Sequence, residues 1–83
     1  MSRLASYRDL VRERLRWTKA VKIAKSFRGG ELLDYAQSTA IEYAHWLDEY
    51  RRSPLRASLE QASERLMQLQ AVQDVLEERY ISE

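Results

Sequence analysis

Two interruptions divide this chain into three segments. Gly29 and Gly30 are its only glycines, and Pro54, which follows Ser53, is its only proline. Glycine readily adopts the left-handed conformation that ends a helix, and a serine followed by proline is a common way to start one. Helix-forming residues dominate the rest of the chain. The sequence therefore predicts three helices with these approximate bounds: 2–27, 31–52 and 54–80.

Apolar residues recur every three or four positions in the second and third segments, which predicts one buried face on each helix. In the second segment the stripe comprises Leu33, Ala36, Ala40, Tyr43, Leu47 and Tyr50, widened by Leu32, Thr39 and Trp46. In the third it comprises Leu55, Leu59, Ala62, Leu66, Leu69, Leu76 and Tyr80. Gln73 occupies the one polar position in that stripe, with Val72 and Val75 nearby.

The first segment changes its apolar face near Thr18. Before this point one stripe comprises Leu4, Tyr7, Val11 and Leu15 together with Thr18, and after it the apolar residues are Ala20, Ile23, Ala24 and Phe27. At 100° per residue the second group lies roughly opposite the first. Either the helix kinks near Thr18, or its second half buries a different face. The latter implies another partner surface, in the same chain or in another.

Both connections are only a few residues long, which favours antiparallel neighbours. We therefore expect a single all-α domain over residues 1–83, built from three antiparallel amphipathic helices in an up-down-up bundle. The alternative is an elongated array in which the first helix leaves the bundle and contributes to an oligomer.

Charge is distributed unevenly along the chain. Residues 1–30 carry nine basic and two acidic side chains, a net +7, whereas residues 31–83 carry five basic and eleven acidic ones, a net −6. A basic face on the first helix comprises Arg8, Arg12, Arg16 and Lys19, and such a face can neutralise nucleic-acid phosphates. The alternative is that it is solvated or pairs with acidic ridges of this chain, such as Glu60, Glu64, Asp74 and Glu78 on the third helix.

Several apolar residues break the polar faces of the predicted helices. These candidate partner-binding residues are Ile23, Phe27, Ile41 and Met67. Several such positions in a domain with a small core favour a protein partner or a homo-oligomer. Phe27 is the strongest candidate, because aromatic anchors often dominate interface energies.

The sequence gives little evidence for catalysis or metal binding. The chain has no cysteine and a single histidine, His45, which with Glu42 forms a Glu-x-x-His spacing on the polar face of the second helix. In di-iron bundles that spacing points into the core. No phosphate-cradling glycine loop is present. We therefore expect no enzymatic activity, no catalytic residue, no cofactor and no metal.

The sequence offers no apolar run long enough to span a membrane and no signal-peptide pattern at its start, so we expect an intracellular, cytoplasmic location. Three helices with Tyr and Ala recurring along the second resemble small helical interaction modules such as the MIT domain, a likeness of pattern that assigns no residue role. We expect a non-enzymatic protein-interaction or assembly module. The alternative is nucleic-acid binding through the basic face of the first helix.

Overall fold

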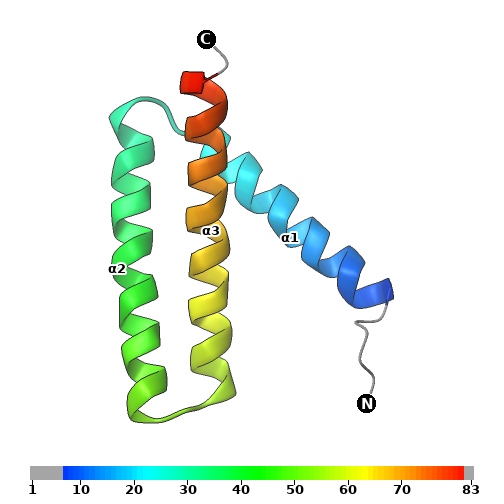
Figure 1. The fold of residues 1–83 in the computed structure, drawn as a ribbon, viewed down its shortest axis with the longest axis vertical. Helices are drawn as coiled ribbons and strands as arrows, with labels where there is room; N and C mark the ends of the chain where they lie inside the picture. Colours follow the sequence, from blue (N-terminus) through cyan, green and yellow to red (C-terminus); the bar gives the residue numbers. More distant parts are fainter. Residues whose placement is uncertain (1–6, 82–83) are drawn as a thin grey trace.

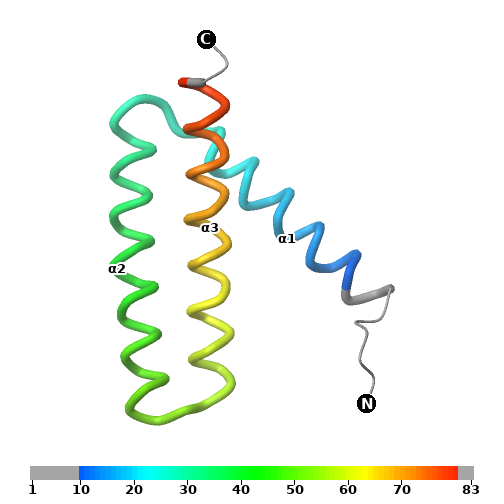
Figure 2. The backbone as a smooth tube through the Cα atoms, in the orientation of Figure 1, coloured from blue at the N-terminus to red at the C-terminus, as the bar shows by residue number. Residues whose placement is uncertain are grey.

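A computed structural model describes residues 7–81 of the chain, with side chains described for residues 10–80. It contains three α-helices: α1 (Tyr7–Ser26), α2 (Gly30–Arg52) and α3 (Arg56–Ile81). The helices α2 and α3 stand side by side and antiparallel, and α1 crosses α3 obliquely (Figures 1 and 2). The predicted all-α three-helix fold is confirmed. The predicted helical residues 2–6 lie outside the described residues.

The turn between α1 and α2 is built on Gly29. Its φ of 53° and ψ of −129° are accessible to glycine but strained for other residues. The main-chain N–H of Leu32 donates to the Gly29 carbonyl at 3.2 Å, and the Glu31 carboxylate accepts from the Arg28 main-chain N–H at 3.2 Å. The turn is thereby hydrogen-bonded on both sides of its glycine.

The turn between α2 and α3 differs slightly from the predicted one. Ser53 ends α2, because its N–H donates to the Glu49 carbonyl at 2.9 Å, and Leu55 precedes the first residue of α3. The Leu55 carbonyl accepts from the N–H groups of Ser58 and Leu59. Helix α3 therefore begins at Arg56, two residues later than the predicted start at Pro54.

The hydrophobic core is small and lies where the end of α1 meets the other two helices. Its central cluster comprises one residue of α1, one of α2 and two of α3: Ala24, Leu32, Val72 and Val75. Phe27 and Tyr35 pack against this cluster and stack on each other, with ring centroids 4.8 Å apart. The core is thus concentrated at one end of the α2–α3 hairpin.

Helix α1 is continuous through Thr18 and shows no sharp bend there in Figures 1 and 2, so the alternative of a kink is wrong. Its second half buries Ala20 and Ala24, while Val11 and Leu15 of the first stripe are exposed. The N-terminal half of α1 diverges from α3, as Figure 1 shows. Of the two alternatives, the second is correct: the two halves of α1 present different faces, and only one of them is covered by this chain.

Candidate interaction surface

A row of large apolar side chains along α3 is exposed. Leu55, Leu59, Leu66 and Tyr80 are 59%, 42%, 39% and 73% exposed. At 100° per residue they share one side of the helix. That side lies roughly opposite Ala71 and Val75, which are buried in the core region. The row therefore faces away from the side of α3 on which α1 packs.

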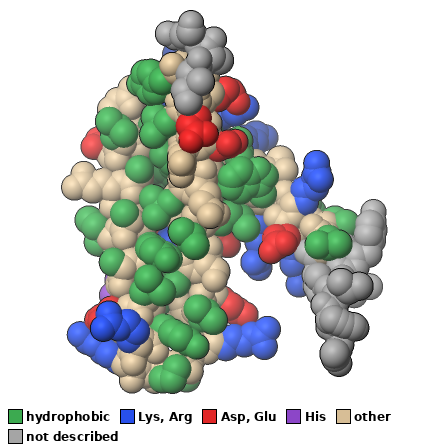
Figure 3. Space-filling view, in the orientation of Figure 1, with side chains coloured by type: hydrophobic (Ala, Val, Ile, Leu, Met, Phe, Trp, Pro, Cys, Tyr) green, Lys and Arg blue, Asp and Glu red, His purple; other side chains and the backbone are tan. Residues whose placement is uncertain are grey.

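Helix α2 adds to this surface. Leu33, Ala40 and Ala44 are exposed and Leu47 is partly exposed, and their spacings of seven, four and three residues place them on one side of α2. Figure 3 shows hydrophobic side chains along both α2 and α3 on the side of the hairpin that α1 leaves uncovered. We call this surface the leucine face, defined by Leu33, Ala40, Ala44 and Leu47 of α2 and Leu55, Leu59, Leu66, Leu69 and Tyr80 of α3.

The leucine face corrects the predicted core. Leu33, Leu55, Leu59, Leu66 and Tyr80 were expected in buried stripes, yet all five are exposed. On α2 the buried positions are instead Leu32 and Thr39, which the pattern places at the edge of the stripe. The reason is that α1 packs on the opposite side of the hairpin and leaves one side of each wide stripe in solvent.

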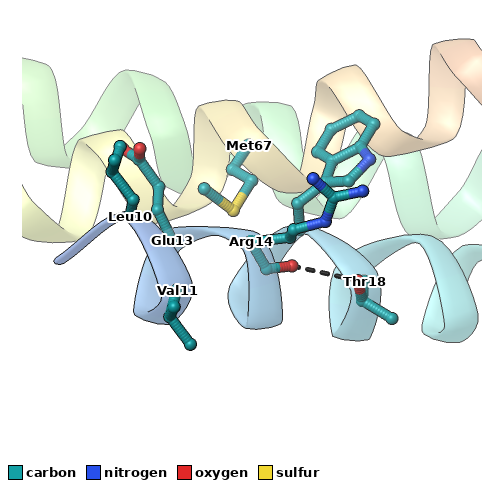
Figure 4. Close-up of a pocket in the computed structure, with 7 residues that line it drawn as sticks. Leu10, Val11, Glu13, Arg14, Thr18 and Met67 are labelled. Carbon is teal, nitrogen blue, oxygen red and sulfur yellow. Dashed lines mark hydrogen bonds between the residues drawn. The ribbon is translucent and has the colours of Figure 1, made fainter. Parts of the chain in front are cut away.

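A second apolar surface lies where α1 diverges from α3. An open hollow of about 820 Å³ is lined by Leu10, Val11, Trp17 and Met67 together with Glu13, Arg14 and Thr18. In Figure 4 the Met67 side chain extends from α3 toward α1, whereas Val11 and Thr18 extend away from α3. The hollow is interrupted by the charged side chains of Glu13 and Arg14.

The four predicted partner-binding residues do not form one surface. Ile41 is exposed, as expected, on the outer side of α2. Ile23, Phe27 and Met67 are only partly exposed. Phe27 is less exposed than expected, because its ring stacks on Tyr35 and packs against the core cluster, although it still lines an open hollow with Tyr35.

The basic face of α1 is exposed at Arg12, Arg16 and Lys19, whereas the side chain of Arg8 lies outside the described residues. None of these three forms an ion pair with another described side chain; α1 is tied to α3 instead by Lys25 and Glu78, 3.7 Å apart. Arg16 lines two shallow hollows that Glu64 also lines, and one of them reaches Glu60. The basic face thus borders the acidic ridge of α3 without forming ion pairs with it.

Glu42 and His45 each contact a neighbouring side chain of this chain. Arg65 of α3 donates from Nε to Glu42 Oε1 at 2.6 Å, and the His45 ring lies edge-on to Trp46. Among the described residues no group of three or more His, Cys, Asp or Glu side chains is placed to hold a metal ion. The Glu42–Arg65 contact links α2 to α3 near the middle of the two helices.

Comparison with known proteins gives no further assignment: no family model, curated protein or solved structure matches this chain. The resemblance to small helical interaction modules stays a likeness of pattern. Among the described helices, none combines the length and the apolar character that crossing a bilayer requires.

Proposed function

We propose that this chain is a non-enzymatic assembly module that binds a protein partner through the leucine face. The observation that carries the proposal is the row of exposed apolar side chains on the side of the hairpin that α1 leaves uncovered, with Leu33 on α2 and Leu55, Leu59 and Leu66 along α3. Burying a fully exposed leucine gains about 1.5–3 kcal/mol, and these leucines, which are 39–59% exposed, would gain a corresponding part of that. Contiguous exposed apolar patches on small domains often mark interaction sites.

The leucine face also has the composition of an interface. Leucine and alanine predominate along most of it, the exposed Gln73 lies within the α3 row, and charged residues such as Arg51, Arg56 and Glu77 lie toward its ends. A depletion of charge at the centre with a polar rim is typical of protein–protein interfaces. The core of the chain alone is small, so burial of this face would add to the stability of the domain.

Site-specific photocrosslinking in cells that express this chain tests the proposal. A photoreactive amino acid at Leu59 or Leu66 is expected to form a covalent adduct whose protein partner mass spectrometry identifies, whether another protein or this chain. The matched control is the same amino acid at Ile41, which is equally apolar and 64% exposed but lies off the face. Adducts from Ile41 as readily as from Leu59 and Leu66, or no adduct from either leucine position, would refute the proposal.

A second candidate function is binding to nucleic-acid phosphates through α1. It is supported by the exposure of Arg12, Arg16 and Lys19 along one helix without ion-pair partners among the described side chains. Such binding weakens steeply as salt rises. The triple substitution Arg12→Gln, Arg16→Gln and Lys19→Gln is expected to abolish a low-salt mobility shift of duplex or single-stranded DNA. The control removes the same charge elsewhere, with Arg51→Gln, Arg52→Gln and Arg56→Gln.

A further inference from the structure

We infer that α1 binds an anionic lipid surface with the side of the helix that faces away from α3. The helix then lies in the plane of the membrane interface. We call this surface the outer face of α1, defined by Val11, Leu15, Thr18 and Lys22 with Arg12 and Lys19 beside them. The inference goes beyond the proposed function, because the leucine face lies on the other side of the hairpin.

The apolar part of the outer face is not covered by this chain. Leu15 is 65% exposed and Val11 is 40% exposed. Val11 and Thr18 extend away from α3 in Figure 4, and the spacing of Leu15 places it between them on the same side. Ala20 and Ala24, on the opposite side of the helix, are buried. The first apolar stripe of α1 therefore takes no part in the core and is open to a partner outside the chain.

Basic side chains border this stripe. At 100° per residue Arg12 and Lys19 lie along one flank, and Lys22 continues the stripe toward the end of the helix. All three are exposed, and none forms an ion pair with another described side chain. Long basic side chains lay their methylene stems along an apolar surface and keep the charge at the level of lipid headgroups.

The acidic ridge of α3 lies beside α1 but not on its outer face. Residues 10–26 hold six basic side chains and one acidic one, Glu13, which helical geometry places roughly opposite the stripe. Within the ridge, Glu78 contacts Lys25, and Glu64 lines a hollow with Lys19. A membrane against the outer face would be separated from α3 by α1 itself, which is about 10 Å across. Physiological salt screens charges over about 8 Å, so the ridge weakens the attraction without cancelling it.

The mixture of basic and apolar side chains favours lipid over nucleic acid. A phosphate backbone is bound by basic and polar side chains, and Val11 and Leu15 would gain nothing from it. An anionic membrane offers phosphates at its surface and acyl chains below, so it is complementary to both kinds of side chain. It is also flat, and it reaches only the side of α1 that the hairpin leaves free. A protein groove that enclosed the helix would collide with α3.

Vesicle binding by the full chain tests the inference. We expect the chain to co-sediment with vesicles of equal parts phosphatidylserine and phosphatidylcholine about tenfold more strongly than with phosphatidylcholine alone, and high salt to reduce the difference. Val11→Ser with Leu15→Ser is expected to weaken binding to the anionic vesicles about tenfold. Arg12→Gln with Lys19→Gln and Lys22→Gln is expected to weaken it about a hundredfold. Helical circular dichroism checks that each variant is folded.

The matched control for the apolar variant is Leu33→Ser with Ile41→Ser, which changes two residues of α2 that are 58% and 64% exposed. This control is expected to bind the vesicles as the natural chain does. Absence of binding to anionic vesicles at low salt, or an equal loss in the control and in the Val11 and Leu15 variant, would overturn the inference. A low-salt DNA mobility shift without vesicle binding would assign the basic side chains to nucleic acid instead.

A fluorophore tests whether the outer face itself enters the interface. Because the natural sequence has no cysteine, Leu15→Cys can carry a single nitrobenzoxadiazole label, whose emission rises in apolar surroundings. Emission is expected to rise on the anionic vesicles for the label at Leu15→Cys and to stay unchanged for the label at Ile41→Cys. An equal response at the two positions, or none at either, would overturn the inference. The proposed function would stand after such a result, because it depends on the leucine face alone.

Discussion

Arg79 of α3 donates from Nη2 to the main-chain carbonyl of Phe27 at 2.8 Å, across 52 residues of sequence. The same nitrogen donates to the Lys25 carbonyl at 3.2 Å. The last carbonyls of a helix have no partner within the helix, and a cation there also interacts favourably with the helix dipole. Arg79 therefore caps α1 and fixes its end to α3.

Replacing Arg79 with methionine is expected to lower the free energy of unfolding by about 1–2 kcal/mol, because two charge-assisted hydrogen bonds are lost at a partly buried site. Urea denaturation followed by circular dichroism measures the change. Arg79→Lys is the control, since it keeps the charge but not the planar guanidinium, and we expect an intermediate loss. Unaltered stability of Arg79→Met would contradict the capping role.

Neighbouring leucines of α2 are expected to respond in opposite ways to truncation. Leu32 is 1% exposed and Leu33 is 58% exposed. Leu32→Ala is expected to cost about 2–5 kcal/mol, because it leaves a cavity in the core cluster. Leu33→Ala is expected to cost less than about 0.5 kcal/mol in protein dilute enough to be monomeric. Thermal unfolding of both variants measures the difference, and equal losses would contradict the observed burial.

The two glycines are also expected to differ. An alanine at Gly29 must adopt the positive φ, which we expect to cost about 1–3 kcal/mol. Gly30 lies at the start of α2 and a Cβ there would meet nothing within 4 Å. Gly30→Ala is therefore expected to be neutral or to stabilise the chain by up to about 1 kcal/mol. Chemical denaturation of both variants gives the sign of each effect.

Stability is expected to fall at alkaline pH through Tyr35. Desolvation by burial raises the pKa of the Tyr35 phenol above its ordinary value of 10.0, reinforced by Glu42 and Glu64 and opposed by Thr39 and Arg65. The unfolded chain therefore loses this proton at lower pH than the folded one. The resulting contribution to stability is complete below pH 10.0 and is lost as pH rises through the folded-state pKa.

Tyr35→Phe is expected to reduce the alkaline decrease in unfolding free energy, which urea titrations at a series of pH values above neutrality measure. The matched control is Tyr80→Phe, at a tyrosine that is 73% exposed. An alkaline decrease that is identical in the natural chain and in Tyr35→Phe would contradict the role assigned to the partly buried phenol of Tyr35.

The local features of the fold follow from short-range chemistry. The Gly29–Gly30 and Ser53–Pro54 interruptions place the turns within two residues of their observed positions, because backbone freedom and the missing proline N–H act within one helical turn. The change of face at Thr18 also predicts that the two halves of α1 have different surroundings. These features depend only on neighbouring residues and on helical periodicity.

The residues of each apolar stripe that are buried could not be predicted from neighbouring residues and periodicity in the same way. The pattern assigns Leu33, Leu59 and Leu66 to the core and leaves Leu32 at an edge, whereas the structure reverses these roles. Likewise, Phe27 was expected to be exposed but is only partly so, because it stacks on Tyr35 and packs against the core cluster. Periodicity locates an apolar side of a helix but does not say which part of a wide stripe a neighbour covers.

The sequence by itself determined three helices, two turns and the opposition between a basic first segment and an acidic remainder. Only the tertiary structure decided that α1 crosses α3 on one side of the hairpin, so that the leucine face on the other side is left uncovered. The physical reason is that helix formation depends on residues a few positions apart. The direction in which α1 packs depends instead on contacts such as Arg79 with Phe27, which join residues far apart in the chain.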